Sequence, residues 1–439
     1  MNKAETIFAN NKKFIPGGVV SLNRSIDPVR SFVKAKGAYL YDVDGNKYID
    51  YHAAFSPHLL GHNDDTVNQA VIESIQNNES LMGAGPTLWE GELAELLCTL
   101  VPNLDSVQIT NTGSEATFHA IRLARSVTGR EEVILMQGGY NGWHNDVAFN
   151  LMDPLEKIKG WKPGGECPLN AMSAGIPSTQ SKLLHAVQYN DLEAIETLLK
   201  TKKIAAILME PILQNIGIIK PQAGFLEGIR TLCDTYGTLL VFDEVKTGFR
   251  HALAGYQSIC GVRPDLCSFG KAVANGYPLG VIGGKKEIMD YFIHPDPKKR
   301  VMVAGTYNAH PTPVAAAIAT LKILRDREAE VYGHLETLGA KMEKGLKAIF
   351  DAHNFKTTTI RQGSAFVTYF MDHAPQNWTD VITHNDMDLD KVYREALIEK
   401  GIFNFPTATK QGSISFAHTA EDIDETLRQT EAVVSQLKH

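Results

Sequence analysis

The sequence has little of what marks secreted, metal-binding, membrane or nucleic-acid-binding proteins. Its five cysteines are scattered without a Cys-x-x-Cys pair, and no histidines cluster at ligand spacing, which argues against a disulfide framework and a structural zinc site. No apolar run approaches the roughly 18 residues of a membrane span, and the N-terminus lacks a signal-peptide stretch. A formal net charge of −7 offers no basic surface to nucleic acid or anionic membranes. We expect a cytoplasmic protein without either partner.

What the sequence does contain is the composition of an ordinary globular enzyme. Of its 439 residues, 44% are hydrophobic and 21% are charged. This length exceeds what one compact core usually holds, which predicts a large domain with a smaller one attached. We place the large domain at residues 66–330 and a small α+β domain at 331–439. The N-terminal segment, residues 1–65, is expected to join the small domain.

Hydrophobic patterning predicts an α/β fold. Residues 37–51 alternate apolar and polar side chains on both sides of Asp44-Gly45, a strong β-hairpin signal. Further along, helical patterns alternate with short apolar runs, and the helices expected at 114–129 and 224–237 each end on a glycine. Uninterrupted apolar strands between helices indicate a mostly parallel sheet covered on both faces. The candidate strands lie at 106–110, 132–136, 204–211, 239–245 and 279–284.

Two further segments stand apart from this alternation. Residues 314–350 predict a long helical passage that leaves the large domain. Residues 151–180 are rich in glycine and proline and show little periodicity. A loop of this length inside a compact domain is usually functional or mobile.

Two strand ends carry candidate chemistry, each with a plainer alternative. Asp243 and Glu244 end an apolar strand, where open α/β sheets bind ligands; the alternative is a helix-capping or solvated acid. Residues 111–114 join a strand to a helix, where Ser114 suits the N-cap position and Gly113 lets an anion approach the backbone. This second motif predicts either a phosphate cradle or an ordinary helix cap. It matches neither GxGxxG nor GxxxxGK[ST], so a dinucleotide or nucleoside triphosphate is not indicated.

An aromatic residue and a lysine add to these candidates. Tyr140 follows the strand at 132–136, where its ring is placed either to stack on a flat ligand or to fill a loop. Lys271 is either a surface lysine or a functional one around which the small residues of SFGKAVANG leave space. Those small neighbours are Gly270, Ala272, Ala274 and Gly276.

Together these parts match the requirements of a pyridoxal phosphate site. A lysine forms a Schiff base with the aldehyde, an acid keeps the ring nitrogen protonated, a helix start holds the phosphate and an aromatic covers the ring. A nicotinamide-dependent dehydrogenase would need a GxGxxG turn after an early strand, which is absent. A non-catalytic homologue would lack the lysine or the acid, and both Lys271 and Asp243 are present.

A resemblance that extends over nearly the whole chain rests on the motifs EPILQNIGIIKPQAGFLEGIR, LLVFDEVKTGFR, FGKAVANGYPLGVIGG and AGTYNAHPTPVAAA. In this order and spacing they resemble the class III (ornithine/ω-) aminotransferase family of fold-type I enzymes, and within it most of all the glutamate-1-semialdehyde 2,1-aminomutases. The resemblance implies a large domain with a mostly parallel seven-stranded sheet covered by helices, plus a small α+β domain. It also implies pyridoxal 5′-phosphate as cofactor and a homodimer with active sites shared across the interface.

The resemblance assigns the catalytic residues one by one. Lys271 matches the Schiff-base lysine, which then acts as the base that moves a proton between substrate and cofactor. Asp243 matches the acid paired with the ring nitrogen. Tyr140 would stack on one face of the ring and Val245 would lie against the other.

It also assigns the residues around the edge of the cofactor. Asn215 matches the residue that hydrogen-bonds the 3-hydroxyl of the ring, and Gly113 with Ser114 matches the phosphate-binding turn. Thr306 matches a threonine that reaches the phosphate from the neighbouring subunit. Glu210 matches a buried acid that we interpret as structural support.

The substrate end departs from the aminomutases. Arg24 matches a residue that grips a substrate carboxylate, which suits the forked guanidinium; the alternatives are a surface arginine and Arg30 as a nearby rival. Lys410 stands where the aminomutases have a glutamate that faces the substrate amines, which disfavours a diamine and suits a second anionic group. Residues 151–180 lack the gating sequence of the aminomutases.

We therefore expect transamination of a small, acidic or β-amino acid substrate. The alternatives on the same scaffold are the internal 2,1 amino shift of the aminomutases and ammonia-lyase or epimerase chemistry. Which bond of the substrate carbon stands perpendicular to the ring decides among them.

Overall fold

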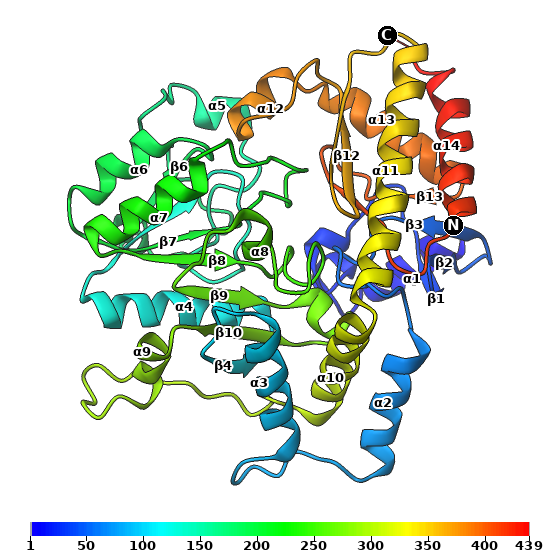
Figure 1. Ribbon diagram of the computed structural model, residues 1–439. Helices are drawn as coiled ribbons and strands as arrows, with labels where there is room; N and C mark the ends of the chain where they lie inside the picture. Colours follow the sequence, from blue (N-terminus) through cyan, green and yellow to red (C-terminus); the bar gives the residue numbers. More distant parts are fainter. Residues whose placement is uncertain (1, 439) are drawn as a thin grey trace.

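Three β-sheets organise the chain in the computed structural model, which describes residues 2–438 (Figure 1). The largest sheet has seven strands, of which only β10 runs antiparallel to its neighbours. The prediction of a mostly parallel sheet is thus confirmed, although β6 and β9 were not among the expected strands. In spatial order the strands are β4 (Ser106–Thr110), β10 (Gly280–Gly284), β9 (Leu266–Phe269), β8 (Leu239–Asp243), β7 (Ile204–Met209), β5 (Glu132–Met136) and β6 (Leu184–Val187).

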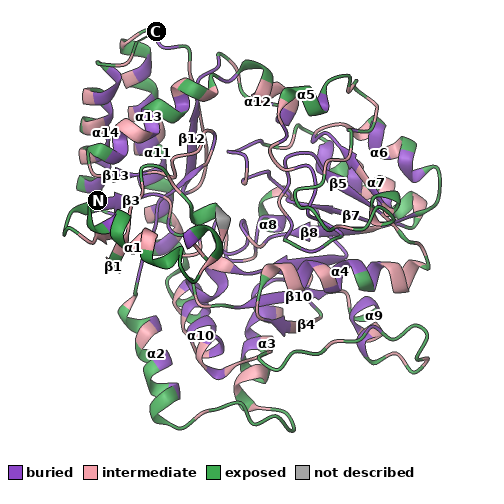
Figure 2. Cartoon of the chain, turned by 180° about the vertical axis from the view of Figure 1, so that it is seen from behind, coloured by how far each residue is buried: buried purple, intermediate pink, exposed green. Residues whose placement is uncertain are grey.

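Helices cover both faces of this sheet. Alternate residues of β7 enter different cores: Ile207 and Met209 share one with α6 (Leu192–Leu199) and α7 (Phe225–Tyr236). Ala206 and Leu208 share the other with α4 (Gly113–Thr128). Figure 2 shows β5, β7 and β8 buried between these layers. Because successive side chains of a strand point to opposite faces, continuous apolar strands require this double cover.

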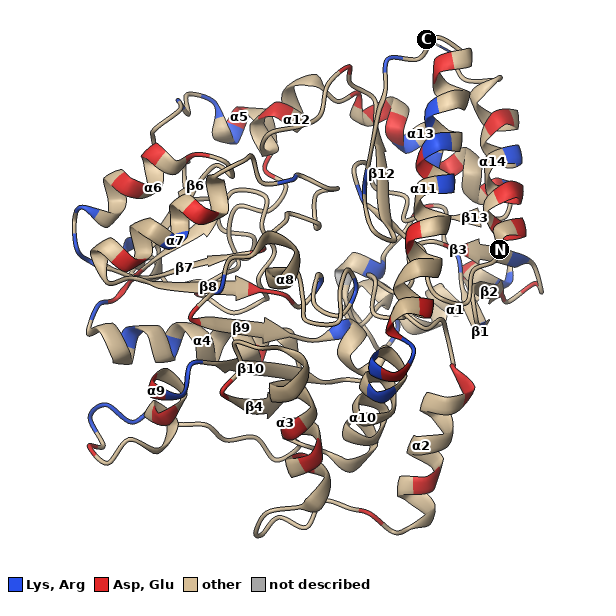
Figure 3. Cartoon of the chain, in the orientation of Figure 1, with Lys and Arg blue, Asp and Glu red and all other residues tan. Residues whose placement is uncertain are grey.

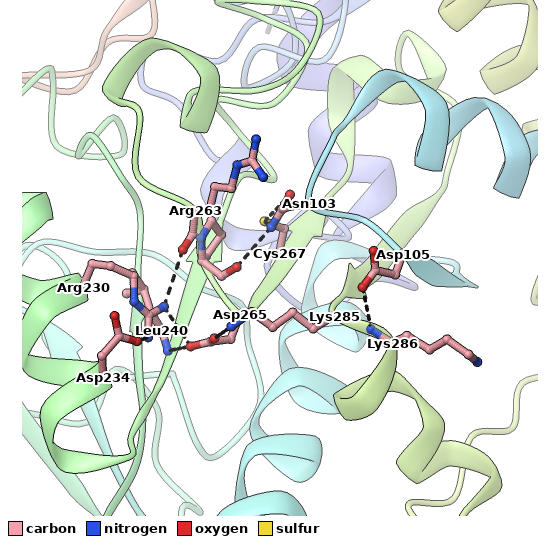
Figure 4. Close-up of polar contacts among 11 residues, drawn as sticks. Asn103, Asp105, Arg230, Asp234, Leu240, Arg263, Asp265, Cys267, Lys285 and Lys286 are labelled. Carbon is pink, nitrogen blue, oxygen red and sulfur yellow. Dashed lines mark hydrogen bonds and ion pairs between the residues drawn. The ribbon is translucent and has the colours of Figure 1, made fainter.

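A buried acid fixes the amino ends of the central strands (Figure 4). Asp265, at the start of β9, accepts a hydrogen bond from the Leu240 backbone N–H of β8 at 2.8 Å. It also pairs with Arg230 of α7 at 2.9 Å and with Lys285, just after β10, at 2.5 Å. One carboxylate therefore ties α7, β8, β9 and β10 together, and the opposite, carboxyl ends of β8 and β9 are held side by side.

The N- and C-terminal parts of the chain share the four-stranded sheet. The predicted hairpin is confirmed as β2 (Tyr39–Asp42) and β3 (Lys47–Asp50), and β1 (Phe32–Lys36) pairs with β2. The short strand β13 (Ile402–Phe403) pairs in parallel with β3. The third sheet consists of β11 (Thr358–Gln362), β12 (Ala365–Tyr369) and β14 (Gly412–Ser413). The domain boundaries at 65/66 and 330/331 stay a prediction.

The long helical passage expected at 314–350 is two helices. α10 (Pro311–Asp326) ends at Arg327, whose φ of −124° and ψ of 30° lie outside helical geometry, and α11 (Glu328–Ala352) then begins. Glu328 and Glu330 fall in the first turn of α11, where the helix dipole favours acids. Apolar periodicity continues across such a break, which is why the sequence pattern does not reveal it.

The remaining helices lie mostly at the periphery. Both charge signs are interspersed along outer helices such as α11 (Figure 3). None of the helices within residues 2–438 combines the length and apolar character of a membrane-crossing segment. The peripheral helices not described above are α1 (Lys3–Asn11), α2 (Asp65–Gln76), α3 (Leu88–Leu100), α5 (Leu155–Ile158), α8 (Gln257–Cys260), α9 (Lys286–Met289), α12 (Trp378–His384), α13 (Met387–Glu399) and α14 (Ala420–Val434).

Candidate active site

The carboxyl ends of β8 and β9 place an acid and a lysine in one site. Asp243 is the last residue of β8 and lies opposite Ser268 of β9 in the sheet register. Lys271 follows two residues after β9 ends, at the start of a short 3₁₀ helix (Lys271–Ala274). The site therefore lies beyond the carboxyl ends of parallel strands, where α/β sheets bind ligands.

Asp243 is buried and held by three hydrogen bonds. Its Oδ1 accepts from the Ser268 hydroxyl at 2.8 Å and from the Val245 N–H at 3.0 Å, and its Oδ2 accepts from the Asn141 amide at 2.9 Å. Burial raises the pKa of Asp243, while these hydrogen bonds oppose that rise. A carboxylate has about four acceptor positions, so Oδ2 retains room for one more donor.

The neighbouring acid, Glu244, serves a different purpose. Its carboxylate accepts hydrogen bonds from the backbone N–H groups of Tyr256 and Gln257 and from the Thr247 hydroxyl. These contacts join the turn that follows β8 to the start of α8 (Gln257–Cys260). Of the two adjacent acids, only Asp243 therefore faces the lysine.

Lys271 has a strained backbone and an unpartnered amine. Its φ of +48° is in the left-handed region, which is costly for a residue with a side chain and recurs at functional sites. Within residues 2–438 its amino group makes no hydrogen bond or ion pair. Burial lowers the pKa of Lys271, and the charges of Asp243 and Glu210 act in the opposite direction.

The expectation that small neighbours clear space around Lys271 is wrong in its detail. Ala272 and Ala274 are buried in the main hydrophobic core. A Cβ on Gly276 would lie 2.3 Å from the His58 ring, so that glycine admits a histidine. A Cβ on Gly270 would lie 3.3 Å from Val245. The small residues let other elements pack closely against the segment.

The start of α4 offers free backbone donors beside Val245. The helix is capped by Thr112, whose hydroxyl accepts from the Glu115 N–H at 3.2 Å, so Ser114 is not the N-cap expected from the sequence. The cap falls at the last extended residue, and Gly113 already begins the helix. Among residues 2–438, the N–H groups of Gly113 and Ser114 have no acceptor. This leaves two aligned donors for an anion.

Val245 lies between the helix start and the lysine loop. A Cβ on Gly113 would approach its two methyl carbons to 2.7 and 2.8 Å, and Gly270 is its neighbour on the lysine loop. The absence of a side chain at Gly113 is thus what lets α4 approach β8 this closely. Val245 therefore links the predicted phosphate cradle to the lysine loop, and its N–H binds Asp243.

A second buried acid, Glu210, positions two of the predicted cofactor-binding residues. This buried acid follows β7 and accepts hydrogen bonds from the Tyr140 N–H at 3.0 Å, the Asn215 amide at 2.9 Å and the Gln214 N–H at 3.0 Å. Burial raises the pKa of Glu210. Burial and the charge of Asp243 also raise the pKa of Tyr140. One carboxylate therefore positions both Tyr140 and Asn215.

Three residues of the site were missed by sequence reasoning. Asn141 and Ser268 bind Asp243, and Lys246 is only 7% exposed beside Val245. Asn141 adjoins Tyr140 and Lys246 adjoins Val245, so adjacency to predicted residues was the one available signal. Ser268 needed the strand register.

The residues predicted at the substrate end, and Thr306, differ in their contacts. The ammonium of Lys410 donates to the Asn215 carbonyl at 2.6 Å, which brings it into the site. Arg24 is exposed and unpaired within residues 2–438, on the rim of a cavity of about 490 Å³. Its rival Arg30 pairs with Glu399 and donates to the Tyr48 hydroxyl, which leaves it committed. Thr306 is exposed on the loop before α10.

These residues fit the pyridoxal phosphate that the sequence predicts. The unpartnered amine of Lys271 is available for an aldehyde, and Asp243 has acceptor capacity for a ring N–H. Gly113 and Ser114 present free N–H groups where a phosphate would be held. The amine, the acid and the backbone donors that the cofactor requires are therefore all free to bind it.

Comparison with known proteins decides the family. The model of the class III aminotransferase family matches residues 22–431. The chain belongs to the class III aminotransferases. It is therefore an enzyme of fold type I that uses pyridoxal 5′-phosphate, and the predicted family and cofactor are confirmed.

The proteins similar to this chain differ in the activity that their names give. The chain is 37% identical to glutamate-1-semialdehyde 2,1-aminomutase 2 of Lachnoclostridium phytofermentans, over 97% of this chain and 98% of that protein. An omega-transaminase from Sphaerobacter thermophilus is 27% identical with a TM-score of 0.89, over 99% and 97% of the two chains. A beta-phenylalanine aminotransferase from Variovorax paradoxus is 25% identical with a TM-score of 0.84, over 98% and 93%.

Proposed function

We propose that this class III aminotransferase transfers the amino group of a small amino acid that carries an additional acidic group or a β-amino group. The observation that carries the proposal is the unpartnered amine of Lys271 beside the buried carboxylate of Asp243. The similarity to a beta-phenylalanine aminotransferase supports β-amino substrates. The cations Arg24 and Lys410 at the substrate end support acidic ones.

The roles of the residues follow from their contacts. When bound, pyridoxal phosphate supplies an aldehyde that links to amines and a ring that withdraws electrons from the substrate carbon. Lys271, whose pKa is lowered by burial, accepts a proton at Nζ. Asp243, oriented by its three donors, holds a proton on the ring nitrogen through Oδ2. Tyr140 and Val245 would confine the ring on its two faces.

Further residues would bind the edge of the ring and the phosphate. Gly113 and Ser114 donate their N–H groups to the phosphate, and Asn215 binds the ring hydroxyl. Glu210 is a positioning residue that holds Tyr140 and Asn215 in place. Arg24 grips a substrate carboxylate.

We also propose a homodimer in which Thr306 completes the partner's phosphate site. Trp143, Met302 and Tyr307 are 69%, 70% and 62% exposed, which is unusual for side chains of this size. Trp143 and Met302 line a cavity of about 400 Å³ that includes Ser114. A second copy would cover this apolar surface beside the phosphate site. All five cysteines are free, which supports a cytoplasmic location.

The internal amino shift is the second candidate, because the relative at 37% identity is a glutamate-1-semialdehyde 2,1-aminomutase. Lys410 argues against it, since a cation opposes a substrate with two amino groups. Ammonia-lyase and epimerase chemistry remain as further outcomes of the same test.

The decisive experiment combines attachment of the cofactor with analysis of products. Borohydride reduction of the holoenzyme should fix the cofactor on Lys271, read as a mass increase of its peptide, and Lys271→Ala should abolish it. Lys322→Ala, which alters an exposed lysine, is the matched control. Asp243→Asn should retain the cofactor and lose at least about a hundredfold in turnover.

A panel of α- and β-amino acids with a 2-oxo acid acceptor then identifies the reaction. Amino transfer to the acceptor supports the proposal. Released ammonia, an isomerised product or an inverted centre would instead establish the lyase, aminomutase or epimerase reaction. A wild-type enzyme that binds no pyridoxal phosphate, or near-normal turnover of Asp243→Asn, would refute the assigned roles.

A further inference from the structure

Two lysines bind consecutive carbonyls of one loop in the site. The ammonium of Lys246 donates to the Gln214 carbonyl at 2.7 Å, and that of Lys410 donates to the Asn215 carbonyl at 2.6 Å. Lys246 comes from the turn after β8 and Lys410 from the loop before β14, so residues far apart in sequence converge here. An ammonium has three N–H donors, and each of these lysines uses one of them on the protein.

Neither lysine has an acid to neutralise it. Within residues 2–438, neither ammonium forms an ion pair with a carboxylate. The charge of Glu210 acts to raise the pKa of both lysines, but its carboxylate accepts from Tyr140, Asn215 and Gln214 and binds neither ammonium directly. A buried cation without a counter-ion is costly, because desolvation is not repaid.

The charges of the cluster reinforce the need for an anion. Burial lowers the pKa of Lys246 well below its usual range, and the neighbouring charges of Lys271 and Lys410 lower it further. Burial also lowers the pKa of Lys410 to about 8. A negative group shared by the two ammoniums would relieve both the desolvation and the mutual repulsion.

Lys246 and Lys410 lie near the cavity that Arg24 lines. His52 lines that cavity, and its pKa is lowered to about 4 by burial and further by the charges of Lys246 and Lys410. Its ring stacks on Phe405, which lines the same cavity, at 4.6 Å. His52 is thus neutral near pH 7, and it lines the cavity while being close enough to both lysines for their charges to lower its pKa. A substrate in the cavity would meet Arg24 and the lysine pair as separate cationic points.

We propose that Lys246 and Lys410 together bind a second oxyanion of the substrate, a carboxylate, phosphonate or sulfonate distinct from the carboxylate held by Arg24. The inference rests on the proposed amino transfer only in taking the ligand to be the substrate. It adds Lys246 as a specificity residue, and it narrows the substrate to amino acids with two acidic groups.

The cofactor phosphate does not account for the lysine pair. The free N–H donors for a phosphate lie at Gly113 and Ser114, and the Val245 side chain covers that side of the turn. Lys246, the next residue, extends to Gln214 on the loop after β7. The predicted phosphate site is therefore formed by the start of α4, whereas the lysine pair lies at the loop after β7.

The test measures binding of ligands that differ only in the distal charge. Succinate and glutarate are compared with butyrate and valerate by calorimetry on the holoenzyme. In the wild type, each diacid should bind at least about tenfold more tightly than its monoacid, as expected for one charge-assisted hydrogen bond. Lys246→Met and Lys410→Met should each abolish this preference, whereas Lys322→Met at an exposed position should preserve it.

A second measurement does not depend on a folded variant. Succinate, but not butyrate, should protect Lys246 and Lys410 of the wild-type holoenzyme from acetic anhydride, as read by peptide mass spectrometry. Kinetics with aspartate, cysteate and 2-amino-3-phosphonopropionate against 2-aminobutyrate then distinguish carboxylate, sulfonate and phosphonate.

The outcomes separate the two proposals. Equal binding of diacids and monoacids, or a preference that survives both substitutions, overturns the lysine-pair site even if amino transfer is observed. A lysine-dependent preference in an enzyme that performs another reaction supports the site and overturns the proposed reaction alone.

Discussion

Replacing Gly113 by alanine tests whether the closeness of α4 and β8 builds the cofactor site. Gly113 is the first residue of α4, and its φ is not left-handed, so alanine brings no backbone strain. The added Cβ would lie 2.7 and 2.8 Å from the methyl carbons of Val245. Contacts below 3.0 Å require something to move. Val245 cannot retreat freely, because it is β-branched and lies against Gly270 on its other side.

The magnitude follows from two opposed effects. Alanine favours a helix over glycine by about 0.5–1 kcal/mol. Overpacking of this kind costs about 1–3 kcal/mol, so we expect a net loss of roughly 1 kcal/mol in the unfolding free energy. The loss of cofactor affinity should be larger, at least about tenfold, because the displaced atoms adjoin the free N–H groups of Gly113 and Ser114.

The assay is a titration of the apoenzyme with pyridoxal phosphate, together with urea unfolding of the same protein. Gly333→Ala is the matched control, since Gly333 is an exposed glycine of α11 with open space where a Cβ would stand. It should leave cofactor affinity unchanged and raise stability by about 0.5–1 kcal/mol. Adding Val245→Ala to Gly113→Ala should restore the space and much of the affinity.

The reasoning fails if Gly113→Ala binds the cofactor as well as the wild type does. It fails equally if the affinity is lost but the double variant recovers nothing, because the collision with Val245 would then not be the cause. A loss of stability without a change in affinity would place the contact outside the cofactor site.

Two further predictions concern acid stability and the substrate. Burial lowers the pKa of His52, His58 and His418 to about 4, so only the unfolded state takes up their protons below pH about 6.5. The free energy of unfolding is therefore highest above that pH. Toward pH 4 it falls by about 1.4 kcal/mol per pH unit for each histidine. A free energy of unfolding in urea that does not change between pH 6.5 and pH 4 would contradict this prediction. Arg24→Ala should raise KM at least about tenfold for amines that carry a carboxylate; an equal loss on neutral amines would exclude Arg24 from substrate binding.

The sheet was predictable where strands are long and apolar. Five of the seven strands coincide with expected runs, because β7 and its neighbours are buried on both faces and read as continuous hydrophobic segments. β6 (LHAV) and β9 (LCSF) are short and each contains a polar residue, so their hydrophobic pattern does not distinguish them from loop segments. Their places in the sheet come from neighbours that are distant in sequence.

The centre of the site was predictable for a different reason. Asp243 ends an apolar strand, and Tyr140 and Gly113 each come shortly after one. Because these strands end at one edge of the sheet, the strand ends alone bring the three residues together. Loop conformation decides the rest. Asn141 binds Asp243 and Lys246 binds the Gln214 carbonyl only because their loops fold back over the sheet edge. No local pattern encodes that return.

The two adjacent acids show how much depends on strand register. Phe242 belongs to the core beneath α7 and Val241 to the core beneath α4, so alternation sends Asp243 toward α4 and the cofactor site. Glu244 points to the opposite face of the sheet, where its carboxylate accepts hydrogen bonds from the backbone N–H groups of Tyr256 and Gln257. A slip of one residue would exchange the two acids and turn Asp243 away from the side of the sheet where Lys271 lies. Asp265 fixes the register from the far edge of the sheet, where it joins the amino ends of β8 and β9 to the carboxyl end of β10.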